Sequence, residues 1–508
     1  MTAAAHRHDF ERQIKGLAVV SDVPSGSRLG LNRIGDAWVP GSSGEFLAVT
    51  SPATGEPVGH VALSTRADVG RAVAAARAAG AGFARMPVFD RARLCHRIAD
   101  VIEARTEALA RLLCLEQGKP LHAEAKGEVA GAVLGFRNAG EQIKWLETAA
   151  FPLQDPNKRA FSFLQPKGIF AIVTPWNFPL ALPAIYYLGP GLATGNAMVW
   201  VPAPTTSLIA VALMECLIEA GVPDGVVNLV LGDGPEIGDE AVAHPGTDAV
   251  GFTGSTETGH AIARRAAGKP LLLELGGNGP SIVLADADVA MAAARIGAGC
   301  FANAGQICTA TERVLAHASV HDALVEGLAA AADKVRLGDA FDPATTMGPL
   351  NNAPNLAKVE AHMADARRRG ASVLRGGGRA AGLPTALHFE PTVVAGLTAD
   401  SLLNLEESFG PIAPVLRFET EEEALALAAS SRFGLSAAVF TSTIRNAFRY
   451  AEALKVGIVN VNEMSCYWEA HIPAGGAAGT GSGLGRTGGR HTLLEMSDLK
   501  TIVFDATR

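Results

Sequence analysis

The sequence predicts an α/β protein with a parallel, doubly wound sheet, a second α/β unit and a small β arm. Strand-like and helix-like segments alternate from residue 168 to residue 274, which is typical of a parallel sheet covered by helices on both faces. The 508 residues exceed the size at which one hydrophobic core stops growing, so two or three packed units are expected. With 48% hydrophobic and 19% charged residues, the chain has the composition of a folded globular protein.

Two helices are expected before the alternating region, over residues 67–79 and 90–117. In the second, Leu94, Ile98 and Ile102 recur at the spacing that places them on one helical face. The charged residues of these segments have no evident chemical partner, so both segments are interpreted as packing helices.

The alternating region is expected to form the first sheet and its helices. The expected strands are 169–173, 197–201, 226–230, 249–252 and 271–274, and the expected helices are 208–220 and 256–266. A second α/β unit is expected from residue 275 to about residue 480. Its predicted elements are a helix over 286–302 and strands over 313–316 and 456–462.

The β arm is expected to combine a hairpin-like segment with the C-terminal strand. Phe161 and Phe163 alternate with the polar Ser162 within residues 145–164, and residues 499–504 are also strand-like. An exposed strand edge is a natural place for pairing with another chain. The alternative is an edge strand that pairs within its own chain.

Charge and hydropathy argue against a nucleic-acid or membrane partner. The formal net charge is -8, and no run of lysine and arginine is longer than Arg367 to Arg369, so no nucleic acid is expected. The apolar stretch 180–201 is interrupted by Pro183 and Pro190, whereas a membrane span needs about 20 uninterrupted residues. Residues 1–20 lack an apolar core behind a basic start, so we expect a loose tail rather than a secretory signal.

The cysteine pattern points to a reducing compartment. The chain holds six cysteines without paired spacing, which argues against a disulfide framework and against a zinc site. A cytoplasmic location is therefore expected.

Two glycine-containing segments are candidates for a dinucleotide site. Gly254 and Ser255 stand between an expected strand and an expected helix, where free N–H groups and the helix dipole favour a pyrophosphate. The alternative is that Ser255 only caps the helix. The run from Gly232 to Gly238 has one residue too many for the usual dinucleotide fingerprint, so it is the weaker signal.

A cysteine and a glutamate form the candidate catalytic pair. Cys308 lies in the polar run Asn303-Ala304-Gly305-Gln306-Ile307-Cys308-Thr309, downstream of Glu274, which precedes Leu275, Gly276 and Gly277. These are the parts for covalent catalysis by a thiol followed by hydrolysis. The alternative for any single cysteine is an inert, buried, small hydrophobic residue.

A third run supplies a donor for a negative oxygen. Thr174-Pro175-Trp176-Asn177-Phe178-Pro179 follows the strand 169–173, and the amide of Asn177 could bind an oxyanion.

Together these three runs resemble the aldehyde dehydrogenase superfamily. The resemblance extends over nearly the whole chain in order and spacing, from Ser51 to Thr501. Further matching motifs are Ser51-Pro52-Ala53-Thr54-Gly55-Glu56, Glu116-Gln117-Gly118-Lys119-Pro120, Phe252-Thr253-Gly254-Ser255-Thr256-Glu257-Thr258-Gly259, Glu406-Glu407-Ser408-Phe409-Gly410-Pro411 and Gly434-Leu435-Ser436-Ala437.

The resemblance implies oxidation of an aldehyde to a carboxylic acid with NAD(P)+. Cys308 would be the nucleophile that forms a thiohemiacetal and then a thioester, Glu274 the base that activates water, and Asn177 the oxyanion donor. The cofactor would be NAD, with NADP possible, and the protein would be a homodimer or homotetramer. The residues implied to contact the cofactor are Thr174, Pro175, Trp176, Gly232, Gly254, Ser255, Leu275, Gly276, Glu407 and Phe409.

The resemblance also implies a Rossmann-type cofactor domain, a catalytic domain and an oligomerisation arm. The cofactor domain is predicted to comprise residues 1–144 and 165–273, and the catalytic domain residues 274–486. The arm is predicted to comprise residues 145–164 and 487–508, which pair between subunits in the family.

The chain departs from the family pattern at the adenosine ribose and at the substrate entrance. Val201 and Pro204 stand where most members carry a lysine and often a glutamate that bind the ribose, so NAD is favoured only slightly over NADP. The loop 473–486 is longer than usual and contains Arg486, whose role the sequence does not reveal. The aromatic pair Tyr467 and Trp468 favours an uncharged or aromatic aldehyde.

Two other functions fit parts of the sequence. One is a CoA-acylating semialdehyde dehydrogenase, although that branch of the family commonly lacks the glutamate that Glu274 matches. The other is a catalytically retired, cofactor-binding structural protein, which Val201 and Pro204 would suggest.

Overall fold

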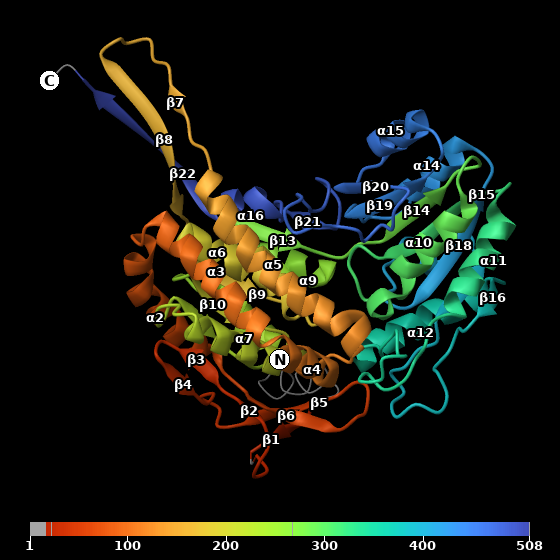
Figure 1. Cartoon of the computed structure of the whole chain (residues 1–508), viewed down its shortest axis with the longest axis horizontal. Coiled ribbons are helices and arrows are strands. Elements are labelled where there is room, and N and C mark those ends of the chain that lie inside the picture. The colour runs from red at the N-terminus through yellow and green to blue at the C-terminus, as the bar shows by residue number, and fades with distance from the viewer. Residues whose placement is uncertain (1–16, 22, 267, 507–508) are drawn as a thin grey trace, which may run out of the picture.

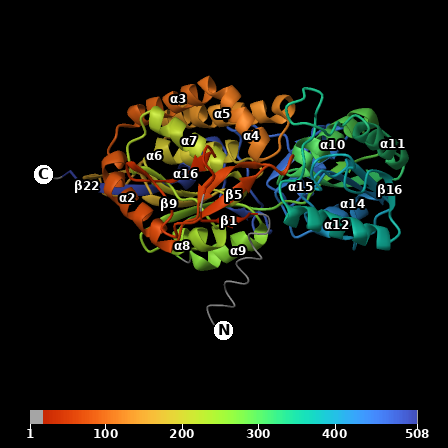
Figure 2. The same cartoon turned by 90° about the horizontal axis from the view of Figure 1, so that it is seen from below.

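The computed structural model describes residues 17–21, 23–266 and 268–506. Figure 1 shows two lobes and an arm of long strands. The first lobe contains residues 169–274 and carries the arm, and the second lobe contains residues 279–461. Seen from below, the lobes lie side by side with the arm at the far end (Figure 2). The predicted N-terminal tail falls largely on residues 1–16, outside the described residues.

The first lobe is built on an eight-stranded sheet with the order β21-β13-β12-β9-β10-β11-β3-β4. Its five central strands are parallel, and β21, β3 and β4 add antiparallel edges. The strands are β3 (Asn32–Ile34), β4 (Ala37–Val39), β9 (Ile169–Val173), β10 (Ala197–Val201), β11 (Val227–Leu229), β12 (Ala249–Thr253), β13 (Leu271–Glu274) and β21 (Gly483–Leu484). β10 and β11 lie on one side of β9, while β12 and β13 lie on the other. The order of successive strands therefore reverses between β9 and β12, and this switch point is where doubly wound sheets bind ligands.

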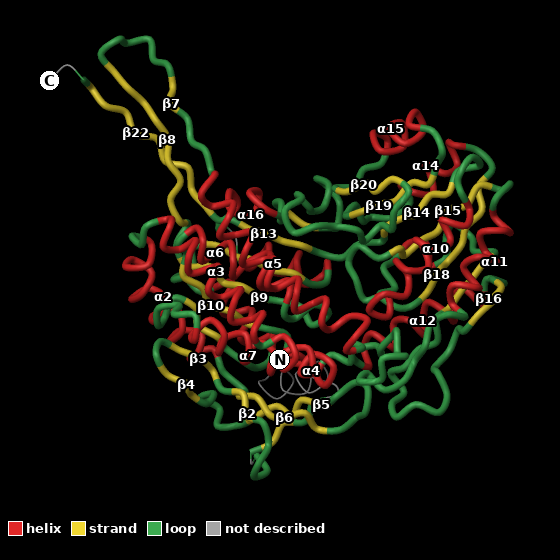
Figure 3. Tube along the Cα trace, viewed as in Figure 1, coloured by secondary structure: helices red, strands yellow, loops and turns green. Residues whose placement is uncertain are grey.

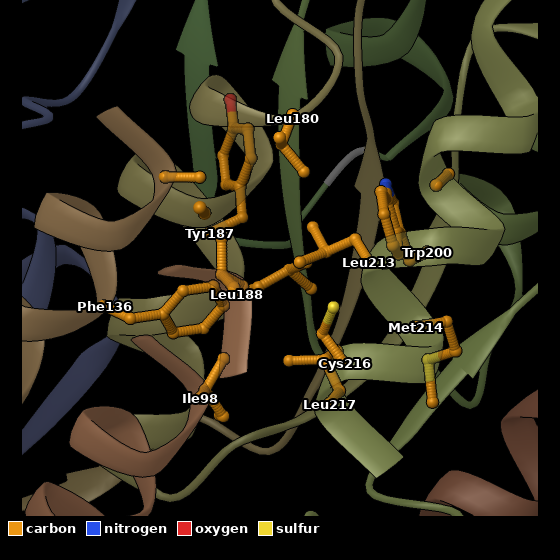
Figure 4. Packing of buried hydrophobic residues seen from close by; sticks show 14 of the residues in the cluster. Ile98, Phe136, Leu180, Tyr187, Leu188, Trp200, Leu213, Met214, Cys216 and Leu217 are labelled. Carbon is orange, nitrogen blue, oxygen red and sulfur yellow. The ribbon is translucent and has the colours of Figure 1, made fainter. Parts of the chain in front are cut away.

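Helices cover both faces of this sheet (Figure 2), and Figure 3 distinguishes them in red from the yellow strands. They are α2 (Arg66–Ala84), α3 (Val88–Ala104), α4 (Thr106–Glu116), α5 (Lys126–Gln142), α6 (Gly189–Thr194), α7 (Ser207–Glu219), α8 (Asp239–Ala243), α9 (Thr256–Arg265) and α16 (Gly489–Glu495). Ile98, Phe136, Tyr187 and Leu217 interdigitate in the core between α3, α5 and α7 (Figure 4). The single helix predicted over 90–117 is in fact two helices, because Arg105 departs from helical geometry at φ -101° and ψ 13°.

The second lobe contains a seven-stranded sheet with the order β16-β17-β18-β15-β14-β19-β20. All neighbouring strands are parallel except the edge pair β16 and β17. The strands are β14 (Gly279–Val283), β15 (Thr311–His317), β16 (Ser372–Arg375), β17 (Thr392–Ala395), β18 (Ile412–Phe418), β19 (Ser436–Phe440) and β20 (Ile458–Val461). The helices are α10 (Val289–Phe301), α11 (His321–Ala332), α12 (Ala353–Arg368), α13 (Leu402–Leu405), α14 (Glu421–Ala429) and α15 (Ile444–Ala453). The helix predicted from residue 286 begins at Val289, because the Asp288 side chain accepts the Met291 N–H and caps it.

The arm is a three-stranded antiparallel sheet of β7 (Ala150–Phe151), β8 (Lys158–Pro166) and β22 (Ser497–Asp505). β22 pairs with β8 of the same chain along its whole length. The two predicted arm segments therefore pair with each other within one chain.

A four-stranded N-terminal sheet completes the fold in the order β1-β5-β6-β2. Its strands are β1 (Val19–Val20), β2 (Leu29–Gly30), β5 (Phe46–Thr50) and β6 (Pro57–Ala62). Short 3₁₀ and π turns occupy Leu121–Ala125, Ile143–Trp145, Pro183–Leu188, Pro204–Thr206, Gly234–Gly238 and Ala302–Gly305.

Two elements lie in the first lobe although their residues belong to segments that were predicted to form the catalytic domain or the arm. β21, within the predicted catalytic segment 274–486, is an edge strand of the first sheet because it pairs with β13. In the predicted arm segment 487–508, the described C-terminal strand is β22, whereas α16 packs against α5 and α6 of the first lobe. The domain boundaries themselves remain a prediction.

Within the described ranges, no helix is both long and apolar enough to cross a membrane. The same residues contain no group of three or more histidine, cysteine, aspartate or glutamate side chains placed to hold a metal ion.

Candidate active site

Two hollows meet at Cys308. The first, which we call the inner cavity, has a volume of about 340 Å³. Its apolar wall includes Phe178, Leu182, Ile185, Tyr186, Leu435, Ile458 and Trp468, and its ionisable residues include Lys119, Glu124, Glu128, Glu274 and Cys308. The second, which we call the sheet-end cleft, has a volume of about 150 Å³. It is lined by Pro175, Trp176, Asn177, Thr253, Gly254, Ser255, Leu275, Gly276, Cys308, Asn355, Lys358, Glu407 and Phe409.

The loop that carries Cys308 has an unusual backbone. After α10, Asn303 and Ala304 adopt positive φ angles of 50° and 54°. Residues other than glycine and asparagine rarely occupy this region of backbone conformation. Gly305 follows at φ 72°, and a Cβ there would lie 2.0 Å from the carbonyl oxygen of Gly410. The Gln306 amide donates to the Asn303 carbonyl at 2.9 Å, which closes the turn. The loop thus presents Cys308 where the two hollows join.

Burial controls the ionisation of Cys308. Desolvation, followed by the negative charges of Glu274 and Glu407, raises the pKa of the thiol to about 12. The resting side chain is therefore a protonated thiol near neutral pH. Since the thiolate is the nucleophilic form, Cys308 must lose this proton before it attacks a substrate.

Glu274 ends β13 and lines the inner cavity together with Cys308. Its side chain is buried, and burial raises the pKa of the carboxyl to about 8, while the Thr487 hydroxyl and the charge of Arg486 act in the opposite direction. The Thr487 hydroxyl donates to Glu274 Oε1 at 3.1 Å. A carboxylate with a pKa near the working pH is suited to exchange protons.

Asn177 is tied to the cysteine loop. Its side-chain amide donates to the Gln306 carbonyl at 3.0 Å. Its own carbonyl accepts from Lys119 Nζ at 2.8 Å and from the Asn303 amide at 3.1 Å. Because a primary amide carries two N–H groups, one remains to bind an oxyanion next to Cys308.

The sheet-end cleft forms where three parallel strands end at the switch point. The chain leaves β9 at Pro175 and Trp176, β12 at Gly254 and Ser255, and β13 at Leu275. Parallel strands direct their carboxyl ends to one edge, so these segments converge there.

The chemistry of this cleft fits a dinucleotide. Ser255 caps α9 and accepts the Thr258 N–H at 3.2 Å, which leaves the first turn of that helix open to a phosphate. Glu407 Oε1 accepts the Gly277 N–H at 2.9 Å. Phe409 packs edge-on against Trp176 with ring centroids 5.5 Å apart. An anion-binding helix end, a carboxylate and flat aromatic surfaces would suit the phosphate, ribose and ring of NAD(P).

Two of the predicted cofactor contacts lie outside this cleft. Thr174 is buried, and its hydroxyl accepts the Trp200 indole N–H at 2.9 Å, so it links β9 to β10. Gly232 follows β11, which is separated from the switch point by β10, and a Cβ there would lie 2.9 Å from the Ser64 nitrogen. The other predicted cofactor contacts line the cleft: Pro175, Trp176, Gly254, Ser255, Leu275, Gly276, Glu407 and Phe409.

The structure adds residues that the sequence did not single out. Thr487 contacts Glu274, and Asn355 joins the cleft from α12. Tyr186 lines the inner cavity from a turn within the apolar stretch 180–201, which hides it among core residues. Lys358 of α12 also lines the cleft, with Nζ 5.5 Å from the Phe409 ring centre.

Comparison with known proteins gives consistent matches over nearly the whole chain. Residues 38–502 match the aldehyde dehydrogenase family. The mitochondrial succinate-semialdehyde dehydrogenase of Arabidopsis thaliana is 37% identical over 92% of this chain and 88% of its own length. The NADP(+) succinate-semialdehyde dehydrogenase GabD of Escherichia coli is 37% identical over 92% of this chain and 96% of its own length.

The fold has close counterparts among solved structures. A point mutant of betaine aldehyde dehydrogenase from Staphylococcus aureus, solved with NAD+, superposes with a TM-score of 0.90. It is 34% identical, and the match covers 94% of this chain and 98% of the other. The predicted fold class and the predicted oxidation of an aldehyde with NAD(P)+ are confirmed. Motifs, fold and relatives all agree, and the chain belongs to the aldehyde dehydrogenase family.

Proposed function

We propose that Cys308, Glu274 and Asn177 carry out the hydrolytic oxidation of an aldehyde. The supporting observation is that Cys308 borders both hollows, with Glu274 in the inner cavity and Asn177 in the sheet-end cleft. The substrate would occupy the inner cavity and the cofactor the cleft, so that both reach the same sulfur atom.

The first half of the reaction forms a thioester on Cys308. The Cys308 thiol passes its proton to solvent water, the sulfur attacks the aldehyde carbon, and the carbonyl oxygen becomes negative. The Asn177 amide and the Cys308 backbone N–H would stabilise that oxygen, a contribution of about 10²–10³ in rate for one donor. When bound, NAD(P)+ supplies the acceptor for the hydride that leaves the adduct.

The second half releases the acid. Glu274 would take a proton from water, whose oxygen attacks the thioester carbon. The carbon–sulfur bond breaks and the thiolate of Cys308 is regenerated. The presence of this glutamate in the cavity supports hydrolysis rather than transfer to CoA.

We propose an aldehyde without a carboxylate tail as the substrate. Lys119 is the cation in the described lining of the inner cavity, and it is already bonded to Glu128 and to the Asn177 carbonyl. Phe178, Tyr186 and Trp468 provide apolar and aromatic surface instead. Burying a carboxylate without a counter-charge is costly, so the semialdehydes named for the relatives fit this cavity poorly.

A comparison of matched aldehydes tests this substrate class. We expect kcat/KM for pentanal and for benzaldehyde to exceed that for succinate semialdehyde by about 10²-fold, because only the last carries a buried charge. Steady-state assays with all three at the same pH measure the ratio. A preference for succinate semialdehyde would show that a cation reaches the substrate tail.

We propose that both NAD and NADP are used, with NAD slightly preferred. Val201 is fully buried in an apolar cluster, and Pro204 begins a short turn with a partly exposed side chain. Neither can donate to the ribose, and neither carries a charge that repels a 2′-phosphate.

A new carboxylate at Pro204 should therefore create selectivity. Pro204→Glu is expected to raise the ratio of kcat/KM for NAD over NADP by roughly tenfold, through repulsion of the phosphate. Pro204→Gln is the uncharged control and should leave the ratio near that of the unmodified enzyme. An equal ratio in both variants would place the ribose elsewhere.

We also propose a homodimer or homotetramer in the cytoplasm. Leu499, Val503 and Phe504 of β22 are exposed on the arm, which supports association through this surface. All six cysteines are free, which supports a reducing compartment.

A further inference from the structure

The glycine-rich loop between Ala474 and Thr487 wraps around the end of the strand that carries Glu274. Gly483 pairs with Glu274 where β21 joins β13. The Leu275 N–H donates to the Ser482 carbonyl at 3.2 Å, and the Ser482 hydroxyl donates to the Gly276 carbonyl at 2.7 Å. The loop is therefore bonded to both residues that follow Glu274.

Glycines make this close contact possible. A Cβ on Gly483 would lie 1.9 Å from the Leu273 carbonyl oxygen, and Gly483 has a φ of 119°. A Cβ on Gly476 would lie 2.6 Å from the Ser482 backbone. Any side chain at either position would push the loop away from β13.

Arg486 closes the loop at its far end. Its guanidinium donates to the carbonyls of Gly476 and Gly485, each at 2.8 Å. Its backbone N–H donates to Glu495 Oε1 at 3.2 Å. These bonds give Arg486 a structural role inside the loop and bring its positive charge near Glu274.

Thr487 is held by the loop on one side and contacts Glu274 on the other. Its backbone N–H donates to the Ala474 carbonyl at 2.9 Å, and its carbonyl accepts the Ala474 N–H at 2.8 Å. Its side chain is fully buried. The hydroxyl donates to Glu274 Oε1 at 3.1 Å.

We propose that Thr487 is a positioning residue that orients the Glu274 carboxylate for attack of water on the thioester. The bond to one carboxylate oxygen would fix the rotation of the group and leave the other oxygen for water. This inference rests on the proposed role of Glu274 as the base. It assigns the loop 474–487 to the hydrolytic step rather than to substrate entry alone.

The charged and titratable groups around Glu274 predict the sign of a pH effect. The Arg486 charge and the Thr487 hydroxyl both favour the ionised carboxylate. Glu274 interacts electrostatically with the titratable groups of Cys308, Tyr186 and Tyr187. Removal of the Thr487 hydroxyl alone should therefore raise the pKa of Glu274. In a plot of the rate of acid release against pH, the rising part of the curve should then move to higher pH.

Rapid-mixing kinetics of Thr487→Val and Thr487→Ser test the proposal. Valine keeps the shape but removes the hydroxyl, so we expect an unchanged burst of NADH and a tenfold to hundredfold slower release of acid, in line with losing a bond to a charged group. Serine restores the hydroxyl and should recover most of the rate and the original pH profile. The proposal would be overturned if Thr487→Val kept both the rate and the pH profile of acid release. It would also be overturned if the NADH burst of Thr487→Val fell by the same factor as its acid release.

A double variant separates this inference from the role of Glu274 itself. If Thr487 acts through Glu274, adding Thr487→Val to Glu274→Gln should slow acid release by less than twofold further. A full additional loss would show that Thr487 acts independently of Glu274 and would overturn the inference. Unimpaired acid release in Glu274→Gln alone would instead contradict the proposed base.

Discussion

Cys308→Ala is expected to lower aldehyde-dependent NADH formation on the order of 10⁴-fold or more. Without the sulfur no thiohemiacetal forms, and hydride transfer from a free aldehyde is unfavourable. Its side chain lines both hollows, whereas Cys466, the other cysteine in the described lining of the inner cavity, does not line the sheet-end cleft. Absorbance of NADH in the steady state, together with a burst measurement, gives the loss.

Cys300→Ala is the matched control for this variant. Cys300 belongs to the preceding helix, is buried, and donates to the Thr311 carbonyl at 3.4 Å, outside both hollows. Its replacement should keep the burst and the turnover within about twofold, apart from some loss of stability through the small cavity left. Full activity of Cys308→Ala would remove the assignment of the nucleophile.

Glu274→Gln is expected to separate the two halves of the reaction. Glutamine keeps the size of the side chain and can still accept the Thr487 hydroxyl, but it cannot take a proton. The thioester should form, giving a burst of about one NADH per site, while steady-state acid release falls roughly 10²–10⁴-fold, the usual contribution of a general base. Rapid mixing followed by quantification of the acid measures both phases.

The pH dependence of the rate of acid release is a second test of the role of Glu274. Because burial raises the pKa of Glu274 to about 8, the carboxyl is mostly protonated, and inactive as a base, below that pH. Acid release by the unmodified enzyme should therefore rise with pH up to about 8 and then level. This rise of the rate with pH should disappear in Glu274→Gln. If the rise persisted, the ionisation would belong to another group.

Much of the fold could be predicted because its signals are local. The strands 169–173, 197–201 and 271–274 were predicted at their observed bounds, since each is a short run of buried residues ended by turn-forming residues. The break at Arg105 and the late start of α10 were missed, because helix ends depend on single backbone angles and caps.

The sequence by itself determined the family, the order of strands and helices, and the candidates Cys308, Glu274 and Asn177, because these follow from residue types in a fixed order. Only the tertiary structure decided which candidates meet. It gathered Pro175, Gly254 and Glu407 at one cleft and left Gly232 outside, because the switch point depends on how strands are ordered in space. It also brought Thr487 to Glu274 across a long stretch of chain, a contact made through the pairing of β21 with β13 that no local pattern encodes.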